Sequence, residues 1–129
     1  MSIFGDDWNT EDGTPIRDYL HVSDLVKGHL DAIRLLDETD GLFTLNLGLG
    51  MGQSVSDVIS AYEYISGRSI PAQVVPRRVG DIGVSFADIS EATKVINWQP
   101  KRRYLICVQI VLDLAAAFNF LFLVISLGA

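Results

Sequence analysis

The sequence predicts a mixed α/β fold built from short strands and helices. Two stretches, residues 23–40 and 54–66, carry apolar side chains at helical spacing, and each is followed by a glycine. The apolar runs 42–47 and 72–75 are too short for typical helices and are bounded by glycine or proline, which is typical of strands. Helical and extended segments therefore alternate along the chain, as they do in α/β proteins.

The first helix is expected to be capped by Ser23, because a serine side chain can accept a hydrogen bond from a free amide of the first turn. Gly41 lies just beyond its end. Its apolar face consists of Leu25, Val26, Leu30, Ile33 and Leu36. The preceding residues 2–14 are rich in Gly, Asp and Thr and are predicted to form a loop with fixed turns.

The second helix has the clearer boundaries. Ser54 is a favourable N-cap, Asp57 stands three residues later, and Gly67 supplies the C-terminal stop. Its apolar stripe consists of Val55, Val58, Ile59, Tyr62 and Ile65. A short third helix is predicted from its cap at Ser90 to about Asn97.

The composition narrows the function classes. The chain has 129 residues, enough for one domain, and a net charge of −6 without a basic run, so nucleic-acid binding is not expected. Cys107 is the only cysteine, which excludes an intramolecular disulfide. The first residues lack the basic and apolar regions of a signal peptide. These features favour a cytoplasmic location.

The glycines of residues 48–52 have two readings. Exposed amides between a strand and a helix can bind the phosphates of a dinucleotide. The spacing is GxGxG, however, and no acidic residue ends a second strand about 20 residues later, as that fold requires. A tight turn before a capped helix is the favoured interpretation.

Metal binding and thiol chemistry are not expected. His21 and His29 are eight residues apart, and no third ligand stands at metal-binding spacing. Cys107 lies in an apolar run without a nearby cation that would lower its pKa, so we expect an inert thiol.

Two clusters of arginine and aspartate have the chemistry of a nucleotide site. Residues 17–19 read Arg-Asp-Tyr, and residues 77–81 read Arg-Arg-Val-Gly-Asp. The planar guanidinium suits a diphosphate, and Asp81 could accept hydrogen bonds from ribose hydroxyls. Surface salt bridges are the alternative role for such residues.

The order and wording of these motifs resemble the UDP-glucose 4-epimerase family, whose members are extended short-chain dehydrogenase/reductases. The similar text in residues 3–25 is Ile-Phe-Gly-Asp-Asp-Trp-Asn-Thr-Glu-Asp-Gly-Thr-Pro-Ile-Arg-Asp-Tyr-Leu-His-Val-Ser-Asp-Leu. It is followed by Gly-His at 28–29, Asn-Leu-Gly at 46–48, Pro-Arg-Arg-Val-Gly-Asp at 76–81 and Asn-Trp at 97–98. The similarity covers residues 2 to about 102 and implies the C-terminal, substrate-binding part of the fold, with the Rossmann half missing.

The resemblance implies a site for the UDP part of a nucleotide sugar. Ser2, Ile3 and Phe4 would lie against the uracil, Arg17 and Arg78 would bind the diphosphate, and Asp81 would bind the ribose. Tyr19 would help shape the wall beside Arg17. Ser85 stands where many family members carry a substrate-contacting tyrosine, so that contact is not expected here.

The family interconverts UDP-glucose and UDP-galactose in galactose metabolism through a 4-keto intermediate and a bound NAD. The resemblance implies that NAD and the catalytic serine, tyrosine and lysine belong to the N-terminal half, so this chain alone is expected to be an inactive part of an isomerase. A family homodimer is possible. The alternatives are a stand-alone UDP-sugar-binding module and a 4-epimerase for UDP-N-acetylhexosamines or UDP-pentoses.

The resemblance divides the chain into residues 1–102, the UDP-sugar-binding region, and residues 103–129, an apolar tail. The tail is long enough to span a membrane, but Asp113 would cost about 3 kcal/mol near a helix centre. One possible back-translation of residues 103–108 yields the family text Leu-Ser-Asp-Met-Cys in a shifted frame. We therefore favour a frameshifted or misassigned 3′ end, giving a poorly docked helix, over a membrane anchor.

Overall fold

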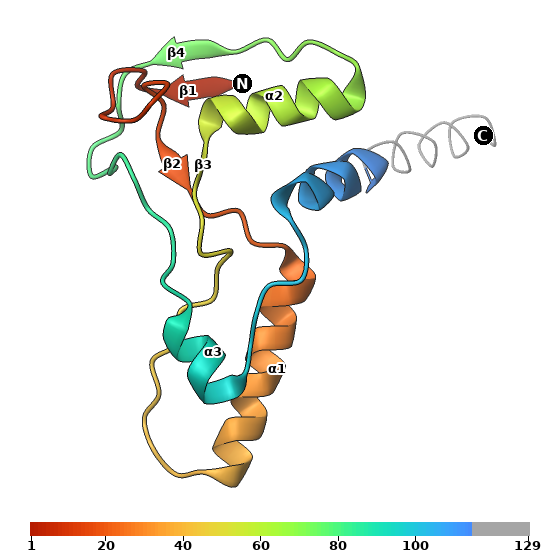
Figure 1. The fold of residues 1–129 in the computed structure, drawn as a ribbon. Helices are drawn as coiled ribbons and strands as arrows, with labels where there is room; N and C mark the ends of the chain where they lie inside the picture. Colours follow the sequence, from red (N-terminus) through yellow and green to blue (C-terminus); the bar gives the residue numbers. More distant parts are fainter. Residues whose placement is uncertain (115–129) are drawn as a thin grey trace, which may run out of the picture.

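The computed structural model describes residues 1–114 as short strands and helices, which confirms the predicted mixed α/β composition (Figure 1). A helical segment covers residues 104–114. β1, β4 and α2 lie at one end of the molecule, and α1 with α3 at the other. In chain order the named elements are β1 (Ser2–Phe4), β2 (Ile16–Arg17), α1 (Val22–Glu38), β3 (Gln53–Ser54), α2 (Val55–Ser66), β4 (Gln73–Val75) and α3 (Ser90–Ile96).

The strands form two small sheets. β1 pairs with β4 in parallel, with Phe4 opposite Val75, and this confirms the extended segment predicted at 72–75. The expectation of a loop throughout 2–14 was wrong for β1, because residues about 70 positions later supply its partner strand. β2 pairs with β3 in antiparallel fashion, and Ile16 also forms a parallel bridge with Val84.

α1 begins one residue before the predicted cap. His21, rather than Ser23, is the N-cap, and its Nδ1 accepts a hydrogen bond from the Ser23 amide at 3.0 Å. The imidazole nitrogen takes the part usually played by a serine or aspartate oxygen. The buried residues of α1 are Asp24 and Gly28. The five residues of the predicted apolar face are 37% to 58% exposed, so that stripe is only partly covered by the rest of residues 1–114.

α2 has the predicted boundaries. The Ser54 hydroxyl accepts from the Asp57 amide, the Asp57 carboxylate accepts from the Ser54 amide, and Gly67 ends the helix in a left-handed conformation. α3 ends at its C-cap Asn97, as predicted. At the other end, Ser90 is the first helical residue rather than the cap, and the N-cap is Ile89, which makes no side-chain hydrogen bond. Asp88 accepts from the Ser90 amide instead.

The strand predicted at 42–47 was wrong. These residues belong to no strand in the structure, and Leu42 is 96% exposed. A strand exists only when a neighbour completes its hydrogen bonds, and no strand within residues 1–114 lies in register with this segment.

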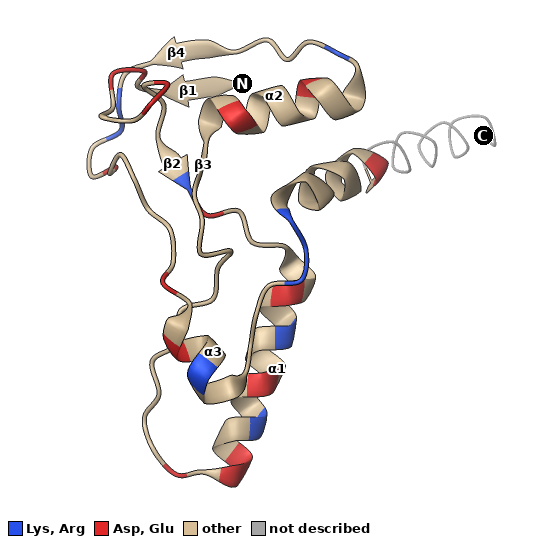
Figure 2. Ribbon diagram, in the orientation of Figure 1, with Lys and Arg blue, Asp and Glu red and all other residues tan. Residues whose placement is uncertain are grey.

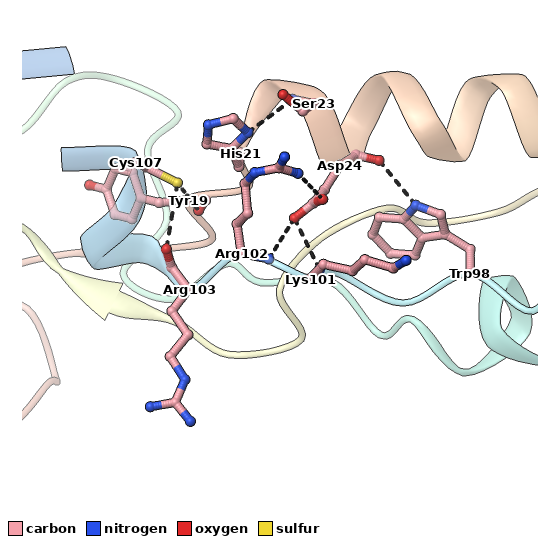
Figure 3. Close-up of polar contacts among 9 residues, drawn as sticks. All are labelled: Tyr19, His21, Ser23, Asp24, Trp98, Lys101, Arg102, Arg103 and Cys107. Atoms are coloured by element: carbon pink, nitrogen blue, oxygen red, sulfur yellow. Dashed lines mark hydrogen bonds and ion pairs between the residues drawn. The ribbon is translucent and has the colours of Figure 1, made fainter. Parts of the chain in front are cut away.

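Asp24 and Trp98 fix the chain that follows α3 onto α1 (Figure 3). Trp98 is 2% exposed, and its indole donates to the Asp24 carbonyl at 3.0 Å. The Asp24 carboxylate accepts from the amides of Lys101 and Arg102 and pairs with the Arg102 guanidinium at 3.0 Å. These contacts join residues 98–102 to α1.

The tail begins with a helix that packs through one face. Val108 is only 3% exposed, whereas Leu105 and Leu114 are 47% and 53% exposed, so the helix packs through Val108 and leaves much of its apolar surface exposed. The prediction for the rest of the apolar tail, residues 115–129, lies outside the described residues. None of the helices within residues 1–114 is both long and apolar enough to cross a membrane.

Candidate functional site

The clearest cluster of predicted site residues lies where β1 and β4 end. Because the strands are parallel, Phe4 and the residues after Val75 emerge at the same edge. The Arg78 guanidinium carbon lies 4.4 Å from the centre of the Phe4 ring. Arg78 Nε also donates to Asp81 Oδ2 at 2.9 Å. The structure therefore brings together three of the predicted residues.

This cluster is open to a ligand. The Arg78 side chain is 59% exposed and that of Asp81 20% exposed. Within residues 1–114 the Arg78 side chain donates only through Nε, so its terminal amino groups retain donors for an anion. The basic residues after β4 lie beside the acidic loop that follows β1 (Figure 2), and Arg77 pairs there with Asp7 at 2.7 Å.

Arg17 contacts the far end of the loop that carries Arg78 and Asp81. Its terminal nitrogen donates to the Ile16 carbonyl at 2.8 Å and lies 3.5 Å from the Gly83 carbonyl. Arg17 also lines an open hollow of about 640 Å³ together with Asn46 and Ser85. Arg17 and the cluster at Phe4 are thus connected through residues 78–83.

The remaining predicted residues form no hydrogen bond or ion pair with Arg78 or Asp81 within residues 1–114, and of them only Ser2 and Ile3 share an element with Phe4. Ser2 and Ile3 form the body of β1 opposite Gln73 and Val74. Tyr19 lines a separate hollow of about 230 Å³ with the Tyr104 and Cys107 side chains. Burial raises the pKa of Tyr19, while the nearby Arg17 charge lowers it. Tyr19 therefore stands near Arg17 but faces the helical segment 104–114.

The glycine-rich turn at 48–52 is occupied by the chain's own carboxylate. Asp18 accepts from the amides of Leu49 at 2.7 Å and Gly50 at 3.3 Å, and also from Ala87 at 3.2 Å. An anion already holds the donors that a phosphate would need, and it would repel a second anion. The favoured reading of a tight turn agrees with this arrangement, and the turn does not fit a dinucleotide.

No family model matches the chain. UDP-glucose 4-epimerase of Bifidobacterium longum subsp. longum is 48% identical over 99 residues, 77% of this chain and 29% of that protein. The solved UDP-glucose 4-epimerase of Stenotrophomonas maltophila, with bound NAD and formylated UDP-arabinopyranose, is similar with a TM-score of 0.78 and 44% identity over 81% of this chain and 31% of its own. The solved UDP-glucose 4-epimerase of Bifidobacterium longum, in complex with NAD+ and UDP, is similar with a TM-score of 0.73. It is 47% identical over 80% of this chain and 30% of its own.

The chain is homologous to the C-terminal part of UDP-glucose 4-epimerases. It spans 29% of the length of the first of these relatives.

The histidines and the cysteine have local roles in this chain. His21 caps α1, and His29 Nδ1 lies 2.8 Å from the Leu25 carbonyl oxygen. Burial raises the pKa of the Cys107 thiol, which agrees with the expectation of an inert group. Within residues 1–114, no three His, Cys, Asp or Glu side chains lie close enough together to bind a metal ion.

Three residues beside the candidate site were not predicted from the sequence. Asp18 holds the glycine turn, whereas its sequence neighbours indicated only that it lies beside Arg17. Trp8 and Arg77 stack at the edge of the Phe4 cluster, with the guanidinium carbon 3.9 Å from the indole centre. The only sequence signal for the Trp8–Arg77 contact was the pair of adjacent arginines at 77–78, because two neighbouring cations favour separate partners.

Proposed function

We propose that this chain holds the UDP part of a nucleotide sugar and acts as part of a UDP-glucose 4-epimerase. The observation that carries the proposal is the meeting of Phe4, Arg78 and Asp81 at the shared edge of β1 and β4. Homology to UDP-glucose 4-epimerases supports it, because one similar structure contains UDP.

The diphosphate would be bound by arginine. Arg78 offers exposed donors beside the Phe4 ring, and Arg17 approaches from the other end of the 78–83 loop. Bidentate hydrogen bonds from guanidinium groups suit phosphate oxygens. Asp81 would then accept from the ribose hydroxyls, while Ser2, Ile3 and Phe4 would flank the uracil, and Tyr19 would support Arg17.

NAD would be bound outside this chain. The dinucleotide-like motif of the sequence is the glycine turn at 48–52, and Asp18 occupies its amides. We therefore propose that the isolated chain does not interconvert UDP-glucose and UDP-galactose, because it lacks the hydride acceptor. Its contribution to the reaction would be to hold UDP in place while the sugar turns.

Two other functions remain as alternatives. A stand-alone UDP-sugar-binding module would use the same residues without joining a cofactor-binding half. A 4-epimerase for UDP-N-acetylhexosamines or UDP-pentoses would differ only at the sugar. A homodimer, a cytoplasmic location and a shifted reading frame after residue 102 also stay predictions.

Isothermal calorimetry with UDP tests the proposal. We expect measurable, weak binding to the unaltered chain, and a loss of about tenfold or more in affinity for Arg78→Ala, because hydrogen bonds to charged groups are lost. Arg34→Ala is the matched control, since it removes an equal charge from a side chain that is 70% exposed on α1.

Equal affinity of the unaltered chain and Arg78→Ala would refute the assignment of Arg78. Incubation of the same preparation with UDP-galactose and NAD should yield no UDP-glucose. Conversion by the chain alone would contradict the placement of the cofactor site outside it.

A further inference from the structure

Trp8 lies between the two segments that carry the proposed UDP contacts. Its indole Nε1 donates to the Phe4 carbonyl at 3.0 Å, at the end of β1. The Arg77 guanidinium carbon lies 3.9 Å from the centre of the same indole ring. One half-buried side chain thus contacts both the strand that presents Phe4 and the loop that presents Arg78 and Asp81.

Two glycines let the indole approach both backbones. A Cβ atom on Gly5 would lie 2.8 Å from Trp8 Nε1, and one on Gly83 would lie 3.0 Å from Trp8 Cε3. Gly5 also has a positive φ of 84°, which favours glycine. The ring is therefore packed against the main chain just after Phe4 and just after Asp81.

The contacts of Trp8 extend to the second sheet. Gly83, which packs against the ring, accepts a hydrogen bond from the Ile16 amide at 2.8 Å and faces the Arg17 side chain. Arg77 is held in turn by the Asp7 carbonyl and carboxylate, at 2.6 Å and 2.7 Å. Trp8 stands where β1, the loop after β4 and β2 meet.

We propose that Trp8 is a positioning residue of the nucleotide site. It fixes the carbonyl of Phe4 and, through Arg77 and Gly83, sets the distance between Phe4 and the loop of Arg78 and Asp81. A site whose groups are held in place before the ligand arrives loses less entropy on binding. This inference rests on the proposed UDP-binding function.

A matched pair of variants tests it. Trp8→Phe keeps an aromatic ring for Arg77 but removes the hydrogen bond to Phe4. Trp98→Phe removes an indole-to-carbonyl hydrogen bond of the same 3.0 Å length, to Asp24, away from the site. UDP affinity is measured by calorimetry for both variants well below their unfolding temperatures.

We expect Trp8→Phe to weaken UDP binding about threefold to tenfold, and Trp98→Phe to leave it unchanged while lowering the unfolding temperature. A merely structural role of Trp8 predicts the opposite for the first variant, namely lower thermal stability with unaltered affinity. That result would overturn the inference and leave the proposed function intact. Absence of UDP binding by the unaltered chain would instead refute the proposed function.

A measurement on the unaltered chain covers the case in which Trp8→Phe does not fold. The two tryptophans give two indole N–H resonances, and the spectrum of Trp98→Phe assigns them. UDP should shift the Trp8 resonance and leave that of Trp98 in place. An unshifted Trp8 resonance at saturating UDP would contradict the inference.

Discussion

Asp24 holds the segment after α3 against α1 with a carboxylate that is only 4% exposed. Burial of a charge is unfavourable unless hydrogen bonds and an opposite charge replace the lost water. Here the replacements are the amides of Lys101 and Arg102 and the Arg102 guanidinium (Figure 3). All of them come from residues more than 70 positions away in the chain.

Asp24→Asn should lower the free energy of unfolding by about 2–4 kcal/mol, because the amide leaves Arg102 and one backbone donor poorly paired. Asp31→Asn, on the same helix, is the control. Asp31 pairs only with the exposed Lys27 and Arg34 within residues 1–114, and such pairs contribute about 0.5 kcal/mol. Urea unfolding followed by circular dichroism measures both variants, and equal, small losses would contradict this role of Asp24.

Single-residue roles were predictable only where they are local. The Ser54–Asp57 capping box spans three residues and was read correctly from the sequence. Asp18 binds amides 31 and 69 positions away, and nothing in its neighbours reveals those partners. His21 was missed as a cap because imidazole rarely takes that role and Ser23 offered the more usual side chain.

α1 shows what hydrophobic spacing can and cannot predict at the scale of an element. The spacing predicted the helix and its apolar stripe, but not which residues of the helix are buried. Those are Asp24 and Gly28, which contact Trp98, whereas the apolar stripe is 37% to 58% exposed. Gly28 is small rather than apolar, and it lets Trp98 and Leu47 approach the helix backbone. The segment 42–47 has strand-like residues but no partner strand within the described residues.

Gly28→Ala tests this packing. Alanine favours a helix over glycine by about 1 kcal/mol. Its methyl group would, however, lie 2.6 Å from Leu47 Cδ1 and 2.9 Å from Trp98 Nε1. We expect the clash to prevail and the free energy of unfolding to fall by about 1–2 kcal/mol.

The control is Lys27→Ala, because that side chain is 53% exposed, and its effect should stay within about 0.5 kcal/mol. A Gly28→Ala chain as stable as the unaltered one would show that α1 does not pack closely on Trp98.

At the scale of the whole molecule, the candidate site is created by a long-range pairing. The sequence indicated arginine and aspartate clusters suited to a diphosphate, and the family resemblance assigned them. The sequence could not show that β4 lies parallel to β1, and this pairing brings Arg78 and Asp81 to Phe4. Tyr19, which the family resemblance placed beside Arg17, lines a separate hollow with Cys107 and the helical segment 104–114.

Titration of the ¹⁵N-labelled chain with UDP, followed by amide chemical shifts, tests the central claim most directly. The proposed site predicts that the largest shifts fall on Phe4, Arg78 and Asp81, at the shared edge of β1 and β4, with smaller ones near Arg17. The glycine turn should stay unchanged, because Asp18 occupies its amides. Shifts confined to residues 48–52, with none at the β1–β4 edge, would contradict the account.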